Sequence, residues 1–285
     1  MIGQLSTLAG QAGDLAVYDA PAPAQPRATV LIVHGLGEHA GRYAHVAAAL
    51  TEAGFTVRAY DHQGHGRSAG RRGTLHTPDG LLQDLCTVID DTRARQPAQP
   101  LVLLGHSMGG LLVARAVAQA LRPVDAVVMS SPALGIRANA LQRLLLSTLP
   151  KVLPHLTIGN GLDPQWVARD PDVVRAYRTD PLVHDRISPR LGAWIWQEGP
   201  KTLGVAERWP LPTLLLYAGT DRLVDPAACD AFAQRAPGTR VQAQRYEAMY
   251  HEVFNDPERE QVLATLTQWL RRRFHNGTRP GLAQL

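Results

Sequence analysis

The stretch from Leu101 to Arg115 constrains the fold of this chain more than any other. An apolar run ends at Leu104, Gly105-His-Ser-Met-Gly109 follows, and apolar residues then recur at helical spacing. The apolar run is typical of a strand that is covered on both faces. A strand-to-helix turn this tight leaves no room for side chains beside the serine, which accounts for both glycines. The pattern predicts a strand, a sharp turn that exposes Ser107, and a helix that begins directly after it.

Other apolar runs alternate with helical patterns along the chain. Strands are predicted at about 13–18, 29–34, 56–60, 124–130, 211–217 and 241–246, and helices at about 42–53, 78–95 and 257–274. Consecutive strand, helix and strand units favour parallel pairing with right-handed crossovers. The sequence therefore predicts an α/β fold with a mainly parallel sheet and helices on both faces.

The alternation stops between residues 133 and 207, where no comparable strand is predicted. Leucine and valine side chains there fall on one helical stripe that Pro150 and Pro154 are expected to interrupt: Leu141, Leu144, Leu145, Leu149, Val152, Leu153 and Leu156. We expect a helical cap, inserted at 133–207 between core segments 1–132 and 208–285. The stripe is compatible with ordinary cap packing, with the lining of an acyl channel, or with transient contact with a lipid surface.

Two further side chains complete a candidate catalytic set with Ser107. Asp221 is the first carboxylate after the predicted strand at 211–217, whereas Asp225 precedes Pro226, as a helix N-cap does. We therefore assign Asp221 to the site and Asp225 to the cap. His251 lies on a loop after the last predicted strand. The order serine, aspartate, histidine is that of the α/β-hydrolase fold, in which the histidine activates the serine and the acid orients the histidine.

Two backbone N–H groups are predicted to bind a developing oxyanion. The strand at 29–34 runs into His34-Gly-Leu-Gly37, a position from which Leu36 can direct its N–H toward a substrate oxygen. Met108, directly after the serine, would supply the second N–H. Acyl transfer of this kind requires no metal and no organic cofactor.

The composition and charge are those of an ordinary globular protein and do not point to a nucleic-acid partner. The chain has 285 residues, of which 45% are hydrophobic and 19% charged, with a formal net charge of +4. This charge is small and dispersed, so no nucleic-acid partner is indicated. The basic run Arg271-Arg272-Arg273 is expected at a solvated helix end, with contact to a membrane surface as the alternative.

Cysteine and histidine spacing gives no metal or disulfide signature. Cys86 and Cys229 are far apart, and His62 and His65 lack a clear third ligand, so the glycine-rich stretch that holds these histidines is expected to be a structured loop. With no signal-like start and no apolar run of about 20 residues, we expect a soluble, cytoplasmic protein, peripheral to membranes if the cap contacts lipid. The sequence does not indicate the oligomeric state.

Several segments together resemble the monoacylglycerol lipases and related lysophospholipases. They are His34-Gly-Leu-Gly-Glu-His-Ala-Gly-Arg-Tyr43, Asp61-His-Gln-Gly-His-Gly-Arg-Ser68, Gly105-His-Ser-Met-Gly-Gly110, Tyr177-Arg-Thr-Asp-Pro-Leu182, Gly219-Thr-Asp-Arg-Leu223 and Tyr250-His251. The resemblance covers nearly the whole chain and is weakest in the cap. It implies hydrolysis of the single ester of a monoacylglycerol, a small lipid substrate, to glycerol and a fatty acid.

The resemblance also implies roles for individual residues. Ser107, Asp221 and His251 would be the catalytic triad, with Leu36 and Met108 as oxyanion donors. Glu38, Arg42, His106 and Tyr177 fall where such enzymes bind or shape the glycerol end of the pocket. Leu36 is larger than the usual residue between the two glycines. A broader carboxylesterase or lysophospholipase stays open as the alternative activity, and a ligand-binding protein without catalysis is the alternative from another class.

Overall fold

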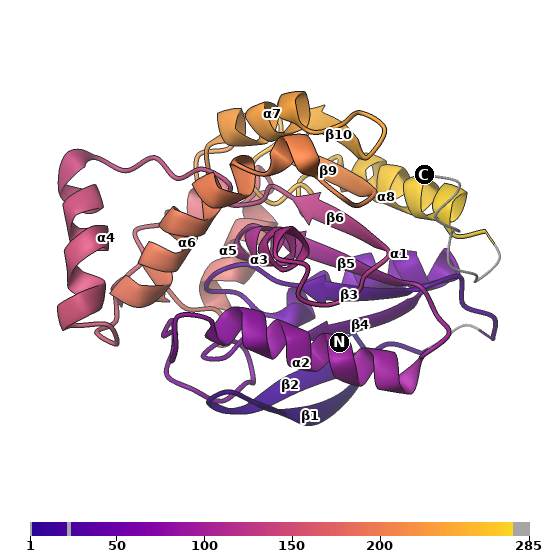
Figure 1. The fold of residues 1–285 in the computed structure, drawn as a ribbon, viewed down its shortest axis with the longest axis horizontal. Helices are drawn as coiled ribbons and strands as arrows, with labels where there is room; N and C mark the ends of the chain where they lie inside the picture. Colours follow the sequence, from indigo (N-terminus) through magenta and orange to yellow (C-terminus); the bar gives the residue numbers. More distant parts are fainter. Residues whose placement is uncertain (1, 22–23, 276–285) are drawn as a thin grey trace.

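The central sheet has the strand order β1-β2-β4-β3-β5-β6-β9-β10 in the computed structural model, which describes residues 2–21 and 24–275 (Figure 1). Its strands are β1 (Gln4–Gly10), β2 (Gly13–Asp19), β3 (Thr29–Val33), β4 (Thr56–Tyr60), β5 (Leu101–His106), β6 (Ala126–Ser130), β9 (Thr213–Ala218) and β10 (Val241–Tyr246). The six strands from β4 to β10 in this order pair in parallel, and β1 and β2 are antiparallel to their neighbours. The predicted mainly parallel sheet is confirmed.

Strand register brings distant loops to one edge of the sheet. Val33 at the end of β3 lies opposite both Tyr60 and Gly105, and Gly105 lies opposite Met129. Because the parallel strands end at nearly the same level, the loops that follow β3, β5, β6 and β9 share one edge. Ligands in open α/β sheets bind outside this carboxyl edge.

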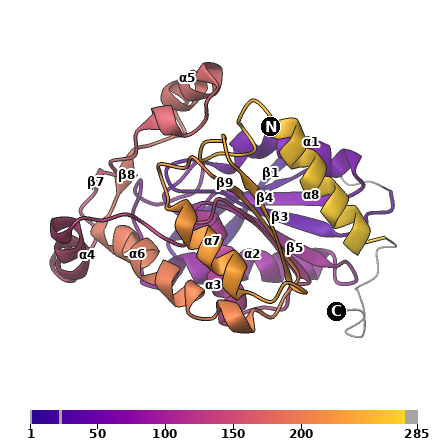
Figure 2. The same cartoon turned by 90° about the horizontal axis from the view of Figure 1, so that it is seen from above.

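Helices cover both faces of the sheet, because side chains from successive strand residues point to opposite faces. They are α1 (Ala44–Glu52), α2 (Gly80–Arg95), α3 (Met108–Ala118), α7 (Pro226–Arg235) and α8 (Arg259–Arg273). Figure 2 shows α1 and α8 on one side and α2, α3 and α7 on the other. Val30 and Ile32 of β3 pack in the cluster that contains α1 and α8, whereas Leu31 and Val33 pack against the opposite layer.

Two local differences from the predicted elements have clear physical causes. The edge strand β1 was not predicted, because most of its residues are exposed or only partly buried and it lacks a strong apolar pattern. The helix predicted at 42–53 begins instead as the 3-10 turn η1 (Ala40–Tyr43), where the His39 side chain accepts a hydrogen bond from the Gly41 N–H, and continues as α1. Gly54, with φ of +92°, follows the end of α1 as predicted.

The insertion, residues 133–207, contains helices and one short β-pair. Its elements are α4 (Ala140–Val152), β7 (Ile158–Gly159), η2 (Pro164–Trp166), α5 (Pro171–Thr179), β8 (Arg186–Ile187), α6 (Pro189–Leu203) and η3 (Ala206–Arg208). The two-residue strands β7 and β8 pair with each other, an element that the expected helical insertion did not include. Such short strands leave no periodic signal in a sequence.

Helix α4 projects from the body of the molecule (Figures 1 and 2). A capping box between Asn139 and Gln142 begins the helix, which continues through Pro150, so the expected interruption there is wrong. Pro150 is tolerated because it lies in the last turn, where only one backbone hydrogen bond is lost before the helix ends. Along the described chain, no helix combines the length and apolar character needed to cross a bilayer. The boundaries of the insertion as a separate cap stay a prediction.

Candidate active site

Ser107 occupies a strained turn between β5 and α3. Its backbone has φ of 54° and ψ of −118°, a conformation that L-residues rarely adopt. A Cβ on Gly105 would lie 2.3 Å from the Gly109 carbonyl oxygen, and one on Gly109 would lie 2.2 Å from the Val33 oxygen. Both positions therefore exclude any side chain, as the sequence predicts. The turn is held by a 2.9 Å hydrogen bond from the Ser107 N–H to the Ser130 carbonyl.

Two backbone N–H groups beside the serine are available to a ligand. Within the described part of the chain, neither the Leu36 N–H nor the Met108 N–H has a hydrogen-bond partner. Met108 begins α3, so its N–H is among those that a helix leaves unpaired and carries the positive end of the helix dipole. Both residues line the same pocket as Ser107. This is the arrangement that stabilises an oxyanion.

His251 and Asp221 form a buried hydrogen-bonded pair at the same edge of the sheet. The distance from His251 Nδ1 to Asp221 Oδ2 is 2.7 Å, and Asp221 Oδ1 accepts the N–H groups of Leu223 and Val224 at 2.8 and 3.0 Å. Burial alone would lower the pKa of His251, but the charge and hydrogen bond of Asp221 outweigh burial and raise it. Burial alone would likewise raise the pKa of Asp221, yet the imidazole and the backbone donors lower it. Both shifts favour an imidazolium beside a carboxylate.

The neighbouring carboxylate, Asp225, has the structural role predicted for it. Its side chain accepts the Ala227 N–H at 3.3 Å and caps α7, which begins at Pro226. The structure thus pairs Asp221 with His251 and places Asp225 at the start of α7.

A small cavity of about 70 Å³ lies where these loops meet. Ser107 and His251 both line it. Polar side chains contribute to its wall from Glu38, His106, Tyr177 and Glu252. The apolar part of the wall includes Leu36, Met108, Ala133, Ile136, Leu162, Val167, Ile195, Leu223 and Val224. The wall therefore combines a small group of polar side chains with a larger apolar surface, to which the insertion contributes five of the nine residues.

Arg42 does not line this cavity, but two carboxylates that do line it, those of Glu38 and Glu252, hold its guanidinium. Its two Nη atoms contact Glu252 Oε1 and Oε2 at 2.6 and 2.7 Å, and Nη1 also contacts Glu38 Oε2 at 2.7 Å. The pair with Glu252 is bidentate, the geometry that suits a planar guanidinium. Burial alone would raise the pKa of Glu252, but Arg42 lowers it. Burial raises the pKa of Glu38, and the nearby Glu252 charge acts in the same direction.

Glu38 shapes the loop that carries the Leu36 N–H. Its Oε1 accepts the Gly35 N–H at 2.6 Å and the Tyr43 hydroxyl at 2.7 Å. Together with the Arg42 contact, these bonds engage both carboxylate oxygens of Glu38. Its side chain thus reaches the cavity wall with both carboxylate oxygens already bound by the protein.

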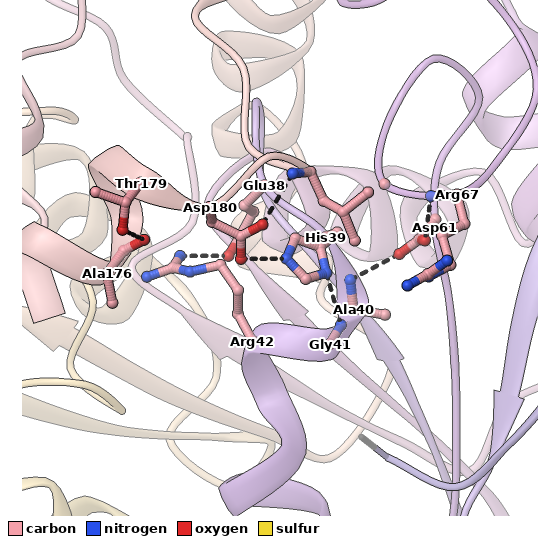
Figure 3. Close-up of polar contacts among 12 residues, drawn as sticks. Glu38, His39, Ala40, Gly41, Arg42, Asp61, Arg67, Ala176, Thr179 and Asp180 are labelled. Carbon is pink, nitrogen blue, oxygen red and sulfur yellow. Dashed lines mark hydrogen bonds and ion pairs between the residues drawn. The ribbon is translucent and has the colours of Figure 1, made fainter.

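The same loop is fixed from two sides, as Figure 3 shows. His39 Nε2 lies 2.9 Å from Asp180 Oδ2, which follows α5 in the insertion. On the other side, Asp61 accepts the N–H groups of Ala40 and Arg67, each at 2.8 Å. The position of the loop therefore depends on contacts with both the core and the insertion.

His106 and Tyr177, two of the predicted substrate-binding residues, also line the cavity. His106 Nδ1 lies 3.0 Å from Ser130 Oγ, and burial, followed by the neighbouring His251, lowers the pKa of His106 to about 3. His106 is therefore neutral at physiological pH. Tyr177 of α5 stacks on Arg42, whose Cζ lies 4.7 Å from the ring centroid.

The sequence reasoning missed Glu252, the second carboxylate on Arg42. The available signal was its position directly after His251, but nothing local connects it with an arginine 210 residues away. It also missed Ser130, the last residue of β6, whose hydroxyl contacts His106.

The histidine-rich stretch after β4 is a structured loop, as predicted. The His62 N–H donates to His34 Nε2 at 3.0 Å, and His62 Nε2 lies 2.9 Å from the His34 carbonyl. Among the residues that the structure describes, no group of three or more His, Cys, Asp or Glu side chains is arranged to hold a metal ion.

Comparisons with known proteins agree with this geometry. The family model Hydrolase_4, described as serine aminopeptidase S33, matches residues 24–258. A monoacylglycerol lipase of Mycolicibacterium smegmatis is 36% identical over 271 residues, which cover 93% of this chain and 95% of that protein. Phospholipase YtpA of Bacillus subtilis is 32% identical over 246 residues, covering 84% of this chain and 93% of that protein.

A solved structure extends the comparison to three dimensions. The crystal structure of the Paleococcus ferrophilus monoacylglycerol lipase matches with a TM-score of 0.81 and 35% sequence identity, covering 89% of this chain and 98% of the other. The resemblance inferred from the sequence segments and the predicted α/β-hydrolase fold are both confirmed.

Proposed function

We propose that this chain, which belongs to the Hydrolase_4 (serine aminopeptidase S33) family, hydrolyses the ester bond of monoacylglycerols to glycerol and a fatty acid. The observation that carries the proposal is the placement of Ser107 on a strained turn in one cavity with His251, which Asp221 holds at 2.7 Å. The similarity to monoacylglycerol lipases supports the choice of substrate.

In the proposed mechanism, His251 removes the proton of the Ser107 hydroxyl, and the serine oxygen attacks the ester carbonyl. The N–H groups of Leu36 and Met108 bind the negative oxygen that forms, which is worth ~3 kcal/mol for each donor. Asp221 keeps the imidazole in the required tautomer and stabilises the imidazolium. His251 then returns the proton to the departing glycerol oxygen. Water, activated by the same histidine, cleaves the acyl-enzyme.

The cavity has a polar side and an apolar side, which suits a lipid with one small polar end. We propose that His106 and Tyr177 contact the glycerol. Glu38 in the wall, and Arg42 through its contact with Glu38, would shape this end of the cavity. The acyl chain would lie along the apolar side. A cavity of about 70 Å³ is smaller than the ~300–1,000 Å³ of typical ligand pockets, so the proposal requires the insertion to move when a long acyl chain enters.

We further propose that the insertion touches lipid surfaces transiently. Support comes from exposed apolar side chains on and after α4, namely Leu141, Leu144, Leu145, Val152, Leu153, Leu156 and Ile158. An apolar face of this kind binds the interface between water and acyl chains. Sedimentation with phospholipid vesicles should retain more wild-type protein than the Leu141→Ser/Leu144→Ser variant. Equal retention of the two proteins would refute the contact.

A substrate panel tests the proposed activity. The purified protein should hydrolyse monoacylglycerols in preference to diacylglycerols, triacylglycerols, lysophospholipids and amide substrates, and Ser107→Ala should lose ~10⁴-fold or more of this activity. Similar rates across many esters would favour the broader carboxylesterase, and a preference for lysophospholipids would favour the lysophospholipase. A protein without any ester hydrolysis would be the non-catalytic alternative.

A further inference from the structure

The segment of the insertion around η2 is docked on the loop that carries the proposed catalytic histidine. The Val167 carbonyl accepts the Glu252 N–H at 2.8 Å. The Arg169 N–H and Nε donate to Asp256 Oδ1 and Oδ2 at 2.6 and 2.8 Å, and Asp256 Oδ2 also accepts the Tyr250 N–H at 3.1 Å. Asp256 is fully buried, and a low local dielectric strengthens such bonds. The insertion is therefore tied to the backbone on both sides of the histidine.

Trp166, the last residue of η2, contacts two loops of the core at once. The guanidinium of Arg222 stacks on the indole, with Cζ 3.8 Å from the ring centroid. The Tyr250 ring contacts the indole from the other loop, with a centroid separation of 5.1 Å and an interplanar angle of 53°. Both separations are those of attractive contacts. Since Arg222 directly follows Asp221 and Tyr250 directly precedes His251, one indole joins the neighbours of both residues.

The core itself joins these two loops only at their bases, among the hydrogen bonds of the described residues. The Gly219 N–H donates to the Tyr246 carbonyl at 2.8 Å, and the Thr220 N–H donates to the Met249 carbonyl at 3.3 Å. Farther along both loops, the indole of Trp166 supplies the contact. Movement of α4, which has no buried residue, need not disturb this segment of the insertion.

We infer that Trp166 is a positioning residue for the proposed reaction: it keeps the loops of Asp221 and His251 in one arrangement, so that the imidazole stays directed at the serine. The inference rests on the proposed ester hydrolysis and deepens it, because it makes one residue of the insertion necessary for the full catalytic rate. Neither Trp166 nor its two contacts, Arg222 and Tyr250, line the cavity that holds the serine. The indole therefore acts through its neighbours and does not touch the substrate.

Separate measurement of kcat and KM tests this role. Trp166→Ala should lower kcat for 1-monoacylglycerol ~10-fold while KM stays within about 2-fold, because catalysis requires closer geometry than binding does. Trp166→Phe keeps an aromatic ring against both neighbours and should recover most of kcat. A loss that appears mainly in KM, or a loss that phenylalanine does not reverse, would overturn the inference.

Trp196→Ala is the matched control. Trp196 is also a partly buried tryptophan of the insertion, on α6, and it does not line the cavity that holds the serine. Its kcat should equal that of wild type. An equal fall in Trp166→Ala and Trp196→Ala would mean that any loosening of the insertion slows the reaction, and would refute a specific role for Trp166.

Arg222→Ala keeps the test decisive if Trp166→Ala does not fold. Arg222 is exposed, so its replacement should leave folding intact. The loss of the stacked guanidinium should lower kcat ~3-fold, since an exposed contact of this kind is weak. An unchanged kcat in Arg222→Ala would show that the indole does not hold the Asp221 loop, and the inference would fail.

The rate at which a small fluorophosphonate labels the serine separates this inference from the proposed function. The rate should fall in Trp166→Ala by about the same factor as kcat, because the probe requires an activated serine but no bound glycerol. Wild type and Trp166→Ala that are labelled equally fast and hydrolyse monoacylglycerol equally well overturn the inference and leave the proposed function standing. Wild type that is neither labelled nor active overturns the proposed function, and the inference with it.

Discussion

The loops at the carboxyl edge of the sheet and the insertion that lies over them are packed very differently. In the loops, Glu38, His106, Asp221 and His251 are almost fully buried, and each is held by at least one hydrogen bond. In the insertion, α4 has no buried residue, and Leu144 is 58% exposed. The difference indicates that the reacting groups are fixed by the core, whereas α4 is held by few buried contacts.

The largest effect on activity is expected from a comparison of two carboxylates on the same loop, Asp221 and Asp225. Asp221→Asn should lower kcat/KM for monoacylglycerol by ~10⁴-fold, because the amide favours the wrong tautomer of His251. Asp225→Asn should retain the activity, since asparagine also caps helices well. Steady-state kinetics of both variants measure the difference. Comparable losses in the two would show that the loop, rather than the contact to His251, matters.

The next effect tests how strongly the core depends on Arg42. Replacing Arg42 by methionine leaves Glu38 and Glu252 buried without their cation, which should lower the free energy of unfolding by about 3–5 kcal/mol at neutral pH. The loss should shrink at acidic pH, where the carboxylates can become neutral. Arg122→Met removes an exposed pair with Asp90 and should cost no more than ~1 kcal/mol. Urea unfolding of both variants tests this, and equal costs would contradict the structural role of Arg42.

The pH dependence of hydrolysis should reveal the charges around His251. Only neutral His251 accepts the serine proton, so activity falls as the pH drops through its pKa. Because this pKa is raised above the ordinary 6.5, the acid limb of kcat/KM should lie above that value. Glu252→Gln removes a charge that raises the pKa of His251, so its acid limb should move to lower pH.

Glu247→Gln is the control for this shift. Glu247 lies on the same loop, but its side chain is 75% exposed, so solvent screens its charge. Its pH profile should match that of wild type. An unchanged profile in Glu252→Gln would show that the Glu252 charge does not reach the imidazole.

The smallest effect is expected in the insertion. Leu144→Ala should change the free energy of unfolding by no more than ~0.5 kcal/mol, since its side chain is largely exposed. Leu112→Ala on α3, where the leucine is fully buried, should cost about 2–5 kcal/mol. Urea unfolding distinguishes them. A large loss for Leu144→Ala would mean that α4 is packed in solution and that the contrast between the two regions is wrong.

The features that could be predicted from the sequence lie mainly in the core, and those that could not lie mainly in the insertion or depend on the complete fold. The buried strands of the sheet, the Ser107 turn and the N-cap role of Asp225 could be predicted, because strand burial, glycine sterics and helix capping are local properties of the sequence. The Arg42–Glu252 pair could not be predicted. Its two residues are far apart in the sequence and come together only in the complete fold. The exposure of α4 in the insertion could not be predicted either, since exposed leucines in a helix produce the same periodicity as buried ones.

Covalent labelling tests most directly whether Ser107 is an activated nucleophile. A fluorophosphonate probe, followed by peptide mass spectrometry, should give one adduct, on Ser107, and much slower labelling in Asp221→Asn. Wild-type protein that stays unlabelled, or that carries its adduct on another residue, would contradict the proposed role of Ser107 and His251.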